Sequence, residues 1–255
     1  MSLNFDKKIV QKNFARAAKS YDEYALVQQL AAEKLCGFIA PFVKNDSKIL
    51  DLGSGTGFVT KSLSALQSPF IYEVDLALEM LTKNKQSNSF KTQADIEYLP
   101  FKPNSFDIII SSFSLQWLTD FEKNFFRFHS LLKPDGIFAF CLPSAGSLEE
   151  LKMAEIFKFN QLPQIENLRL ALKNSGFTEN LFHKETIRQE FVNGFEALKS
   201  LKKIGANHTG NTNNLVTKSQ LRQFDNFCLK KFRADNKNIF TSWIIPYFIS
   251  SKSKN

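Results

Sequence analysis

Short apolar runs alternate with amphipathic segments through the middle of the chain. The apolar runs, which we predict to be β-strands, span residues 48–52, 70–75, 90–93, 106–111 and 137–142. The segments between them repeat apolar residues at helical spacing, so helices are predicted at 57–66, 77–85 and 120–132. Regular alternation of strand and helix predicts a parallel sheet with right-handed crossovers.

The N-terminal residues are predicted to form a pair of helices. Residues 4–19 are amphipathic, and a second helix is predicted from Ser20 as N-cap, with Glu23 three residues on, to about Ile39, before Pro41. Such a pair either folds over a bound ligand as a lid or packs against the edge of the sheet. The pattern is compatible with both arrangements.

The C-terminal part is predicted to be mostly helical with two late strands. Helices are expected at 147–160, 165–174, 194–204 and 217–232, and strands at 179–191 and 240–249. Ser147 and Glu150 have the spacing of a capping box, and Gly176 suits a helix C-cap. Pro246 cannot donate to a ladder, so we expect a bulge or an early strand end there. A polar, mobile loop is predicted over 207–214.

The chain is predicted to be one domain of the α/β class. Its 255 residues suffice for a large core, and no repeat or linker divides them. We expect a seven-stranded, mostly parallel sheet with helices on both faces. Within the single domain 1–255, residues 1–45 form the N-terminal helical part, 46–143 the ligand-binding core, and 144–255 the part that faces substrate or partner.

Three glycines follow the first predicted strand at alternate positions. The stretch reads Asp51-Leu52-Gly53-Ser54-Gly55-Thr56-Gly57, where a strand turns sharply into a helix and the backbone can approach a ligand. The third glycine comes one residue too early for a dinucleotide loop, which reads G-x-G-x-x-G. Asp51 suits a ligand with an ammonium group, and Asp75, at the end of the next strand, can bind both ribose hydroxyls.

This glycine motif together with Asp75 resembles the class I S-adenosylmethionine (SAM) methyltransferases, which have a Rossmann-like fold. The resemblance implies that Asp95, with Ile96 after the third strand, accepts a hydrogen bond from the adenine amino group. Met80 could lie against the adenine, but a methionine at helical spacing is also typical of a core. The residues that we predict to bind SAM are Asp51, Gly53, Ser54, Gly55, Gly57, Asp75, Leu76, Met80, Asp95, Ile96 and Ser112.

The segment after the fourth strand, Ser112-Phe113-Ser114-Leu115-Gln116-Trp117, lies at the predicted carboxyl edge of the sheet. Open α/β sheets bind their ligands at that edge. Gln116 and Trp117 could therefore line a methyl-transfer pocket, or the aromatic ring could pack against the next helix.

Several other classes of site are not supported by the sequence. The three histidines do not cluster, and Cys36, Cys141 and Cys228 lack metal-binding or disulfide-frame spacing. We expect reduced, mostly buried thiols in a cytoplasmic protein, no metal site, and no Ser-His-Asp or Cys-His nucleophile. The basic N-terminus has no signal-peptide core, and no apolar run approaches the ~18 residues of a membrane span.

The net charge of +8 is unevenly distributed. Residues 1–183 hold 20 basic and 20 acidic side chains, whereas residues 184–255 hold 13 and 5, so the whole excess lies in the last 72 residues. A one-sided basic surface attracts an acidic partner, although a lysine-rich composition alone could also produce it.

Further motifs narrow the resemblance to one family. They are Phe14-Ala15-Arg16-Ala17-Ala18-x-Ser20-Tyr21-Asp22…Gln28, Asp95-Ile96-Glu97-x-Leu99-Pro100, Leu115-Gln116-Trp117, Gly146-Ser147-Leu148-x-Glu150-Leu151, Leu198-Lys199-Ser200-Leu201-Lys202-Lys203-Ile204-Gly205-Ala206-Asn207-His208 and Thr217-x-Ser219-Gln220-Leu221. Over nearly the whole chain they resemble the malonyl-acyl carrier protein O-methyltransferases of biotin synthesis, the BioC type. The resemblance implies SAM as methyl donor, the free carboxylate of a malonyl thioester as acceptor, and an acidic acyl carrier protein as partner. A malonyl carboxylate is already ionised at pH 7, so no catalytic base is needed.

The resemblance also implies that Tyr21, Gln116, Trp117 and Lys199 position the substrate. Lys199 stands where the family generally has arginine, which keeps the charge but loses the bidentate geometry. The family's His-x-Asn-x-Phe pattern is replaced by Leu162-Pro163-Gln164-Ile165-Glu166-Asn167-Leu168, where only Asn167 remains. If the missing histidine contributes to acceptor binding, the acceptor differs while SAM binding is retained.

Three alternatives stay open at this point. The chain could methylate another small acid, as the trans-aconitate type does, without a carrier protein. It could be an assembly factor with the same fold that methylates nothing. A nucleic-acid methyltransferase is favoured only by the positive charge, because no Asn/Asp-Pro-Pro-Tyr-like motif or basic-aromatic stretch is present, and we expect neither nucleic acid nor a membrane as partner.

Overall fold

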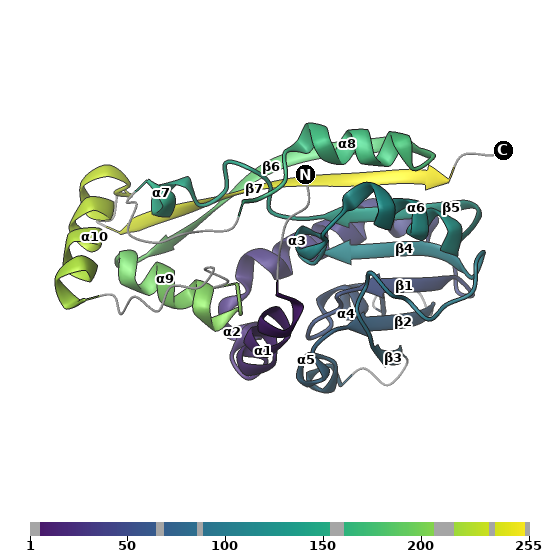
Figure 1. Cartoon of the computed structure of the whole chain (residues 1–255), viewed down its shortest axis with the longest axis horizontal. Coiled ribbons are helices and arrows are strands. Elements are labelled where there is room, and N and C mark those ends of the chain that lie inside the picture. The colour runs from purple at the N-terminus through teal and green to yellow at the C-terminus, as the bar shows by residue number, and fades with distance from the viewer. Residues whose placement is uncertain are drawn as a thin grey trace.

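A computed structural model describes residues 6–64, 69–85, 89–153, 161–206, 217–234 and 238–252. Its centre is a seven-stranded sheet with helices on both faces (Figure 1). The strands are β1 (Lys48–Leu52), β2 (Phe70–Asp75), β3 (Ser89–Gln93), β4 (Phe106–Ser112), β5 (Leu132–Cys141), β6 (Phe177–Phe191) and β7 (Ile239–Lys252). The helices are α1 (Lys7–Ala17), α2 (Tyr21–Tyr24), α3 (Leu26–Ile39), α4 (Phe58–Ser64), α5 (Leu78–Lys83), α6 (Phe121–Leu131), α7 (Glu149–Lys152), α8 (Ile165–Asn174), α9 (Gly194–Lys203) and α10 (Lys218–Lys231), with short 3-10 turns η1 (Ala40–Phe42) and η2 (Leu115–Trp117).

The strand order is β3-β2-β1-β4-β5-β7-β6, which confirms the predicted fold class. Strands β1 to β5 are parallel to one another, and β7 runs antiparallel between β5 and β6. The order reverses between β1 and β4, so the chain leaves β1 toward one edge of the sheet and β4 toward the other. Open α/β sheets bind ligands at the carboxyl ends of the strands on either side of such a reversal.

Each face of the sheet has its own apolar core, because successive strand residues point to opposite faces. On one face Ile49 and Ile108 pack with side chains of α3 and α4. On the other face Leu50 and Ile109 pack with side chains of α6 and α8, including an interlocked group of phenylalanine rings around Phe138. The two cores hold β1 and β4 rigidly and thereby position the turns that follow them.

The last two strands form an arm that extends beyond the rest of the sheet. Strand β7 pairs with β5 only from Tyr247 to Ser251, but it pairs with β6 along its whole length. Because β7 is antiparallel to β5, its residues 239–246 extend past the carboxyl end of β5, where the arm carries α7, α9 and α10 (Figure 1). We call residues 239–246 and their partners 184–191 the β6–β7 arm.

The bulge or early strand end expected at Pro246 is wrong. The pairing of Pro246 with Lys184 is regular, and the irregularity in this ladder lies between Glu179 and Leu181. Pro246 immediately precedes the segment of β7 that pairs with β5. At that position β7 has no β5 neighbour that would need its missing N–H, so proline is tolerated as at an edge.

The predicted helix from Ser20 to Ile39 is also wrong in part. It is broken at Ala25 (φ −92°, ψ 37°) into α2 and α3, and the Ser20 side chain does not cap α2. The Ser20 hydroxyl instead donates to the carbonyl of Lys203, 3.2 Å away at the end of α9. A residue with N-cap spacing therefore joins the N-terminal helices to the C-terminal part of the chain.

The capping box predicted at Ser147 and Glu150 is absent for a similar reason. Leu148 has a left-handed backbone (φ 57°), and α7 begins only at Glu149 with no side-chain cap. The Ser147 hydroxyl accepts from the Ile244 N–H at 2.9 Å, and the Glu150 carboxylate accepts from the Ser242 N–H at 3.1 Å. Both side chains thus satisfy backbone donors of the β6–β7 arm.

Other local predictions are confirmed. Gly176 has φ 84° just after α8, as a C-cap glycine requires, and Thr217 with Gln220 forms a full capping box at α10. Strand β5 begins earlier than predicted because residues 133–136 form a bulge within it, with Asp135 at φ 61°. The predicted loop 207–214 and the second half of the predicted helix 147–160 lie outside the described residues.

Candidate cofactor and methyl-transfer site

A pocket of about 840 Å³, counted with its open mouth, lies at the carboxyl ends of β1, β2 and β4. Its walls come from the glycine loop, the turns after β2, β3 and β4, and the N-terminal helices α1 to α3. It lies where the reversal of strand order predicts a ligand.

The glycine loop turns tightly over the end of β1. Gly53 has φ 68°, and a Cβ at this position would lie 2.2 Å from the Cβ of Ser114. The N–H groups of Gly53 and Ser54 donate to the carbonyl of Val74 at 2.8 and 3.0 Å. Only glycine permits both this backbone angle and this close approach, so the predicted strand–turn–helix geometry is confirmed.

Asp51 is a buried carboxylate without a hydrogen-bond partner. Its residue is 1% exposed, and neither of its oxygens has a partner within the chain. Burial, followed by the nearby carboxylates of Glu73 and Asp75, raises the pKa of Asp51 well above its ordinary value. A buried acid without a partner is unfavourable, and a ligand bearing an ammonium group would supply the missing donors and charge.

Asp75 ends β2 and is held by backbone donors. Its two oxygens accept from the N–H groups of Gly55 (2.9 Å) and Ala77 (2.8 Å). Burial nevertheless raises the pKa of Asp75 to about 6, because the loss of solvation outweighs these hydrogen bonds. The bonds fix the carboxylate against the glycine loop at the pocket wall.

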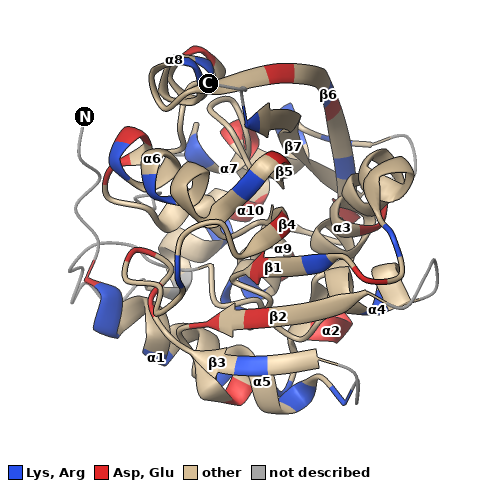
Figure 2. Cartoon of the chain, turned by 90° about the vertical axis from the view of Figure 1, so that its right-hand side faces the viewer, with Lys and Arg blue, Asp and Glu red and all other residues tan. Residues whose placement is uncertain are grey.

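A third buried acid near the pocket, Glu73, was not predicted from the sequence. It pairs with Asp51 across β1 and β2 and is fully buried. One of its oxygens accepts from Thr60 (2.7 Å) and from Asn84 (2.6 Å), and Glu73 Oε2 has no hydrogen-bond partner. Acidic segments therefore lie side by side on β1 and β2, as the red stretches of these strands in Figure 2 show.

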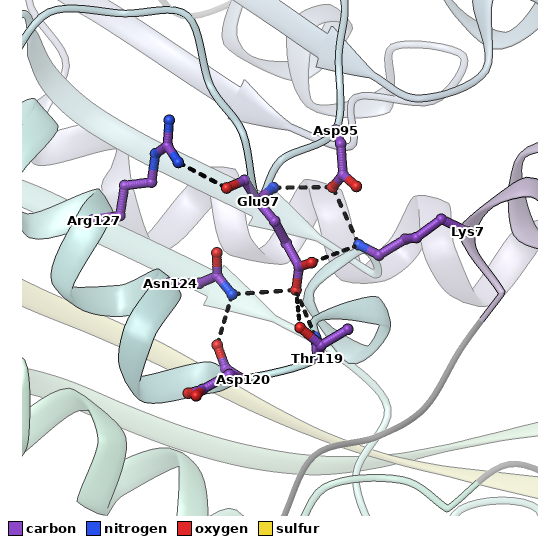
Figure 3. Close-up of polar contacts among 7 residues, drawn as sticks. All are labelled: Lys7, Asp95, Glu97, Thr119, Asp120, Asn124 and Arg127. Carbon is purple, nitrogen blue, oxygen red and sulfur yellow. Dashed lines mark hydrogen bonds and ion pairs between the residues drawn. The ribbon is translucent and has the colours of Figure 1, made fainter.

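Asp95 joins the turn after β3 to helix α1 (Figure 3). The Lys7 ammonium lies 3.1 Å from Asp95 Oδ1 and 3.4 Å from Glu97 Oε2. The other oxygen of Glu97 accepts from the N–H and hydroxyl of Thr119, at 2.6 and 2.8 Å, and from the amide of Asn124 at 3.2 Å. These bonds, led by Thr119, outweigh burial and lower the pKa of Glu97.

This network makes the turn a fixed wall of the pocket. Figure 3 shows Lys7 reaching from α1 toward both acids, with Arg127 bonded to the Glu97 carbonyl from the opposite side. Asp95 Oδ2 makes no hydrogen bond with any described residue, so one oxygen of the predicted adenine ligand is free for a donor.

Aromatic side chains close the pocket beneath the N-terminal helices. Phe14 of α1 packs edge-on against Trp117, with ring centroids 5.8 Å apart, and Tyr21 packs against Phe58 at 6.0 Å. Tyr21 also lines the pocket, and burial next to Asp75 raises the pKa of its hydroxyl, which keeps it protonated. Met80 lines the pocket and also packs against Ala17 and Ala18 of the N-terminal segment.

Most of the predicted site residues are brought together. The pocket is lined by Tyr21, Asp51, Gly53, Ser54, Gly55, Asp75, Leu76, Met80, Asp95, Ile96, Ser112 and Trp117. Gly57 lies outside this lining, directly before α4. Gln116 also lies outside, because its amide turns back to the Phe113 carbonyl at 2.8 Å.

Lys199 is not brought to this pocket. Its side chain is 42% exposed on α9, and its ammonium lies 3.0 Å from Glu196 Oε2. Hydrogen bonding to Glu196 raises the pKa of Lys199, so it is a cation on the surface. A part for Lys199 in acceptor binding stays a prediction.

Several lining residues had no sequence signal of their own. Lys7 and Val10 belong to an ordinary basic amphipathic helix, and Gln28 and Phe113 have no role in the motifs that contain them. Phe113 has a left-handed backbone (φ 55°), which is rare for a bulky residue and marks a constrained site.

Two other kinds of site are not found in the described part of the chain. There, no group of three or more His, Cys, Asp or Glu side chains is arranged to hold a metal ion. Within the same residues no helix combines the length and apolar character of a bilayer span. All three cysteines are buried, as predicted.

The chain resembles known methyltransferases in sequence and in structure. Residues 50–140 match the family model described as "Methyltransferase domain". The chain is 32% identical over 226 residues to the malonyl-acyl carrier protein O-methyltransferase of Buchnera aphidicola, covering 86% of this chain and 89% of that protein.

Solved structures show the same fold at lower identity. The YcgJ protein of Bacillus subtilis superposes with a TM-score of 0.64 at 16% identity, over 87% of this chain and 99% of that one. A phosphoethanolamine N-methyltransferase from Haemonchus contortus, solved with S-adenosyl-L-methionine, gives a TM-score of 0.57 at 18% identity, over 94% of this chain and 57% of that one.

Proposed function

Since the chain belongs to the family of malonyl-acyl carrier protein O-methyltransferases, we propose that it methylates the free carboxylate of a malonyl group carried by an acyl carrier protein, using SAM. The cofactor assignment rests mainly on Asp51, which is buried at the glycine loop and has no hydrogen-bond partner for either carboxylate oxygen. The product is a malonyl methyl ester. Methylation removes the negative charge of the carboxylate, so enzymes that extend neutral acyl chains can accept the product.

The residues of the pocket fit SAM. Asp51 would accept from the ammonium group of its methionine part, and Asp75 from the ribose hydroxyls. Asp95 would accept from the adenine amino group through its free Oδ2, with Ile96 and Met80 against the ring. The backbone of the glycine loop can approach the ligand at Gly55, where no atom lies within 4 Å of the position that a Cβ would take.

The cofactor, when bound, supplies an electrophilic methyl group attached to a sulfonium sulfur. A carboxylate lone pair would form the new C–O bond to this methyl as the C–S bond breaks, and the sulfur would leave as a neutral thioether. The chain has to hold the acceptor oxygen in line with that methyl and exclude water. Trp117, Phe14 and Phe58 form the apolar walls suited to this work. Tyr21 stays protonated and can donate a hydrogen bond.

No proton has to be removed from the acceptor. A malonyl carboxylate is ionised at pH 7, whereas a neutral alcohol or amine would need a base. The acids that line the pocket, Asp51, Asp75 and Asp95, are all assigned to the cofactor. The site therefore suits an acceptor that is already an anion.

Helix α1 is proposed to act as a lid. Lys7, Val10 and Phe14 line the pocket from α1, and Gln11 donates to the carbonyl of Leu76 at 2.9 Å. Of the two arrangements compatible with the sequence, these contacts favour the lid over packing at the sheet edge.

The basic C-terminal part is proposed to face the acidic carrier. Helix α9 presents Lys199, Lys202 and Lys203, and α10 ends in Lys230 and Lys231. Charges of one sign on the arm side would raise the rate of encounter with an acidic protein.

The decisive experiment is mass spectrometry of malonyl-acyl carrier protein after incubation with SAM and the enzyme. We expect a mass gain of one methylene on the malonyl group. Methylation of free dicarboxylates but not of the carrier-linked acid would show that the enzyme is of the trans-aconitate type. Failure to bind SAM would favour the assembly factor that methylates nothing.

A further inference from the structure

A second, narrow cavity adjoins the cofactor pocket on the side of the β6–β7 arm. It is enclosed by α2, α3, α7, α9 and the arm, and Gln28 lines both cavities. Its side chains approach one another too closely to leave room for a water molecule, so a ligand can enter it only when the surrounding side chains move apart. Gln28 thus lies between this cavity and the pocket in which SAM is proposed to bind.

Two buried polar side chains in this cavity lack partners. Gln28 is 6% exposed, and its amide makes no hydrogen bond with any described residue. Trp243 of the arm is 5% exposed, and its indole Nε1 has no partner. Buried polar groups are normally bonded, so the enclosed Trp243 N–H without a partner, together with the unbonded Gln28 amide that faces both cavities, points to a ligand that accepts hydrogen bonds.

The backbone around the cavity is constrained on two sides. Phe113, with φ 55°, lines the cofactor pocket, and its ring packs against Trp243 with centroids 5.9 Å apart. Leu148, with φ 57°, lines the second cavity and donates its N–H to the carbonyl of Ser242 in the arm at 2.8 Å. Left-handed bulky residues persist only where the surroundings hold them, and they gather at functional sites.

The donors in this cavity are neutral. Among the described residues that line it there is no lysine, arginine or histidine. The cation of the neighbouring pocket, Lys7, is paired with Asp95 and Glu97 at the far wall. A neutral donor can orient a carboxylate oxygen without an ion pair that would reduce its nucleophilicity.

Resting on the proposed function, we propose that this second cavity is the acceptor subsite and that Gln28 and Trp243 recognise the malonyl thioester. The Gln28 amide, which borders both cavities, donates to the carboxylate oxygen that is not methylated. The Trp243 N–H, deeper on the arm side, donates to the thioester carbonyl. An acyl group with a free carboxylate next to its thioester matches this pair of donors.

The test compares variants in steady-state methylation of malonyl-acyl carrier protein, with the dissociation constant of S-adenosylhomocysteine as a second readout. Gln28→Ala removes one donor and is expected to lower kcat/KM for the acceptor about tenfold. Gln28→Glu adds repulsion and is expected to lower it about a hundredfold, while Trp243→Phe, which keeps the ring, lowers it about fivefold. S-adenosylhomocysteine binding should stay within about twofold in all three.

Gln29→Glu is the matched control. Gln29 is the next residue of α3, and its amide bonds to Glu33 on the exposed surface, so the same added charge should leave acceptor kinetics unchanged. A further comparison uses the methyl ester product as inhibitor. Gln28→Glu should weaken binding of the acid far more than binding of the neutral ester, which a merely structural role would not do.

The outcomes separate the two proposals. If the unaltered enzyme makes no methyl ester from any malonyl thioester, the proposed function fails and this inference falls with it. If the enzyme is active but Gln28→Ala and Trp243→Phe keep its acceptor kinetics, the subsite is wrong while the function stands. Parallel loss of acid and ester binding, or of S-adenosylhomocysteine binding, would also overturn the subsite.

Discussion

The ammonium of Lys7 lies 3.1 Å from the carboxylate of Asp95 and so joins helix α1 to the turn after β3. The two residues are 88 positions apart in the sequence, and both line the cofactor pocket. The ion pair therefore holds the proposed lid against the wall that is predicted to bind adenine.

Replacing Lys7 by alanine should loosen this lid. A partly buried ion pair is worth about 1 kcal/mol, so the dissociation constant of S-adenosylhomocysteine should rise about fivefold in calorimetry. The neighbouring Lys8 is exposed on the same helix, and Lys8→Ala removes the same charge without the contact. An equal rise for Lys8→Ala would mean that charge alone, and not the ion pair, explains the effect.

Asp51→Asn should stabilise the protein while weakening cofactor binding. The substitution removes a buried charge without a partner, and the free energy of unfolding in urea at pH 8 should rise by about 1–2 kcal/mol. The dissociation constant of SAM should rise at least about tenfold, because a charged hydrogen bond to its ammonium is lost.

A surface acid supplies the contrast for Asp51→Asn. Asp107 is bonded to the Lys133 ammonium at 2.8 Å, which lowers the pKa of Asp107, so Asp107→Asn should lower stability slightly and leave SAM binding unchanged. Lower stability of Asp51→Asn would contradict the assignment of a buried, unpaired acid.

The contribution of Asp75 to the stability of the protein should fall as the pH rises from about 4 to about 7. Its pKa is about 6 in the folded state against an ordinary 3.8, so the folded form binds the proton more tightly. The stability that this provides is complete below pH 3.8 and is lost as the pH rises through about 6, a change of roughly 3 kcal/mol. Asp51, whose pKa is also raised, acts in the same direction.

Urea unfolding of the original chain and of Asp75→Asn at several pH values checks this. His129, whose pKa is lowered by burial, acts in the opposite direction within the same range, so the difference between the two proteins is the relevant quantity. Glu97 and Glu185 have lowered pKa values and act only below about pH 4.5. A difference that does not decrease with pH would contradict the burial of an uncompensated Asp75.

Gly205→Ala should separate α1 from α9. Gly205 has φ 75°, and a Cβ there would lie 3.0 Å from Phe14 Cδ1 and 3.3 Å from the carbonyl oxygen of Asn13. We expect a loss of about 1–2 kcal/mol in unfolding free energy. Gly37, inside α3, has no atom within 4 Å of the position that a Cβ would take, so Gly37→Ala should instead stabilise by about 0.5–1 kcal/mol. Destabilisation by both substitutions to the same extent would argue against a specific contact at Gly205.

Lys199→Ala should reduce use of the carrier-linked acceptor without changing SAM affinity. Because the side chain is exposed, we expect a rise of about two- to fivefold in KM for malonyl-acyl carrier protein, which disappears at high salt. Lys44→Ala, which removes a charge just before β1 at the opposite end of the sheet, should have no effect. A large loss of SAM binding in Lys199→Ala would contradict its placement on the arm side.

The parts of the site that could be predicted from the sequence are those built by short stretches of chain. The glycine loop and Asp75 lie at the ends of two predicted strands, and the parallel pairing of β1 with β2 brings them together without further information. Their residue types are dictated by local backbone geometry and by the ligand's polar groups.

The parts that could not be predicted depend on distant partners. Ser147 and Glu150 have capping-box spacing, but they bond to the backbone of β7 almost a hundred residues later. Lys7 and Gln28 acquire their roles only because α1 and α3 are folded against the carboxyl edge of the sheet. Spacing along one helix contains no information about such neighbours.

The overhang of β7 beyond β5 places the proposed acceptor subsite on a different part of the sheet from the cofactor pocket. Residues 239–246 pair only with β6, so substitutions there alter a two-stranded ribbon and not the parallel strands around β1. Evolution could therefore refit the acceptor end for a differently shaped acid while the nucleoside end stayed as it is. A chimaera in which this ribbon and its attached helices come from a related methyltransferase would be a rational starting point for changing the acceptor.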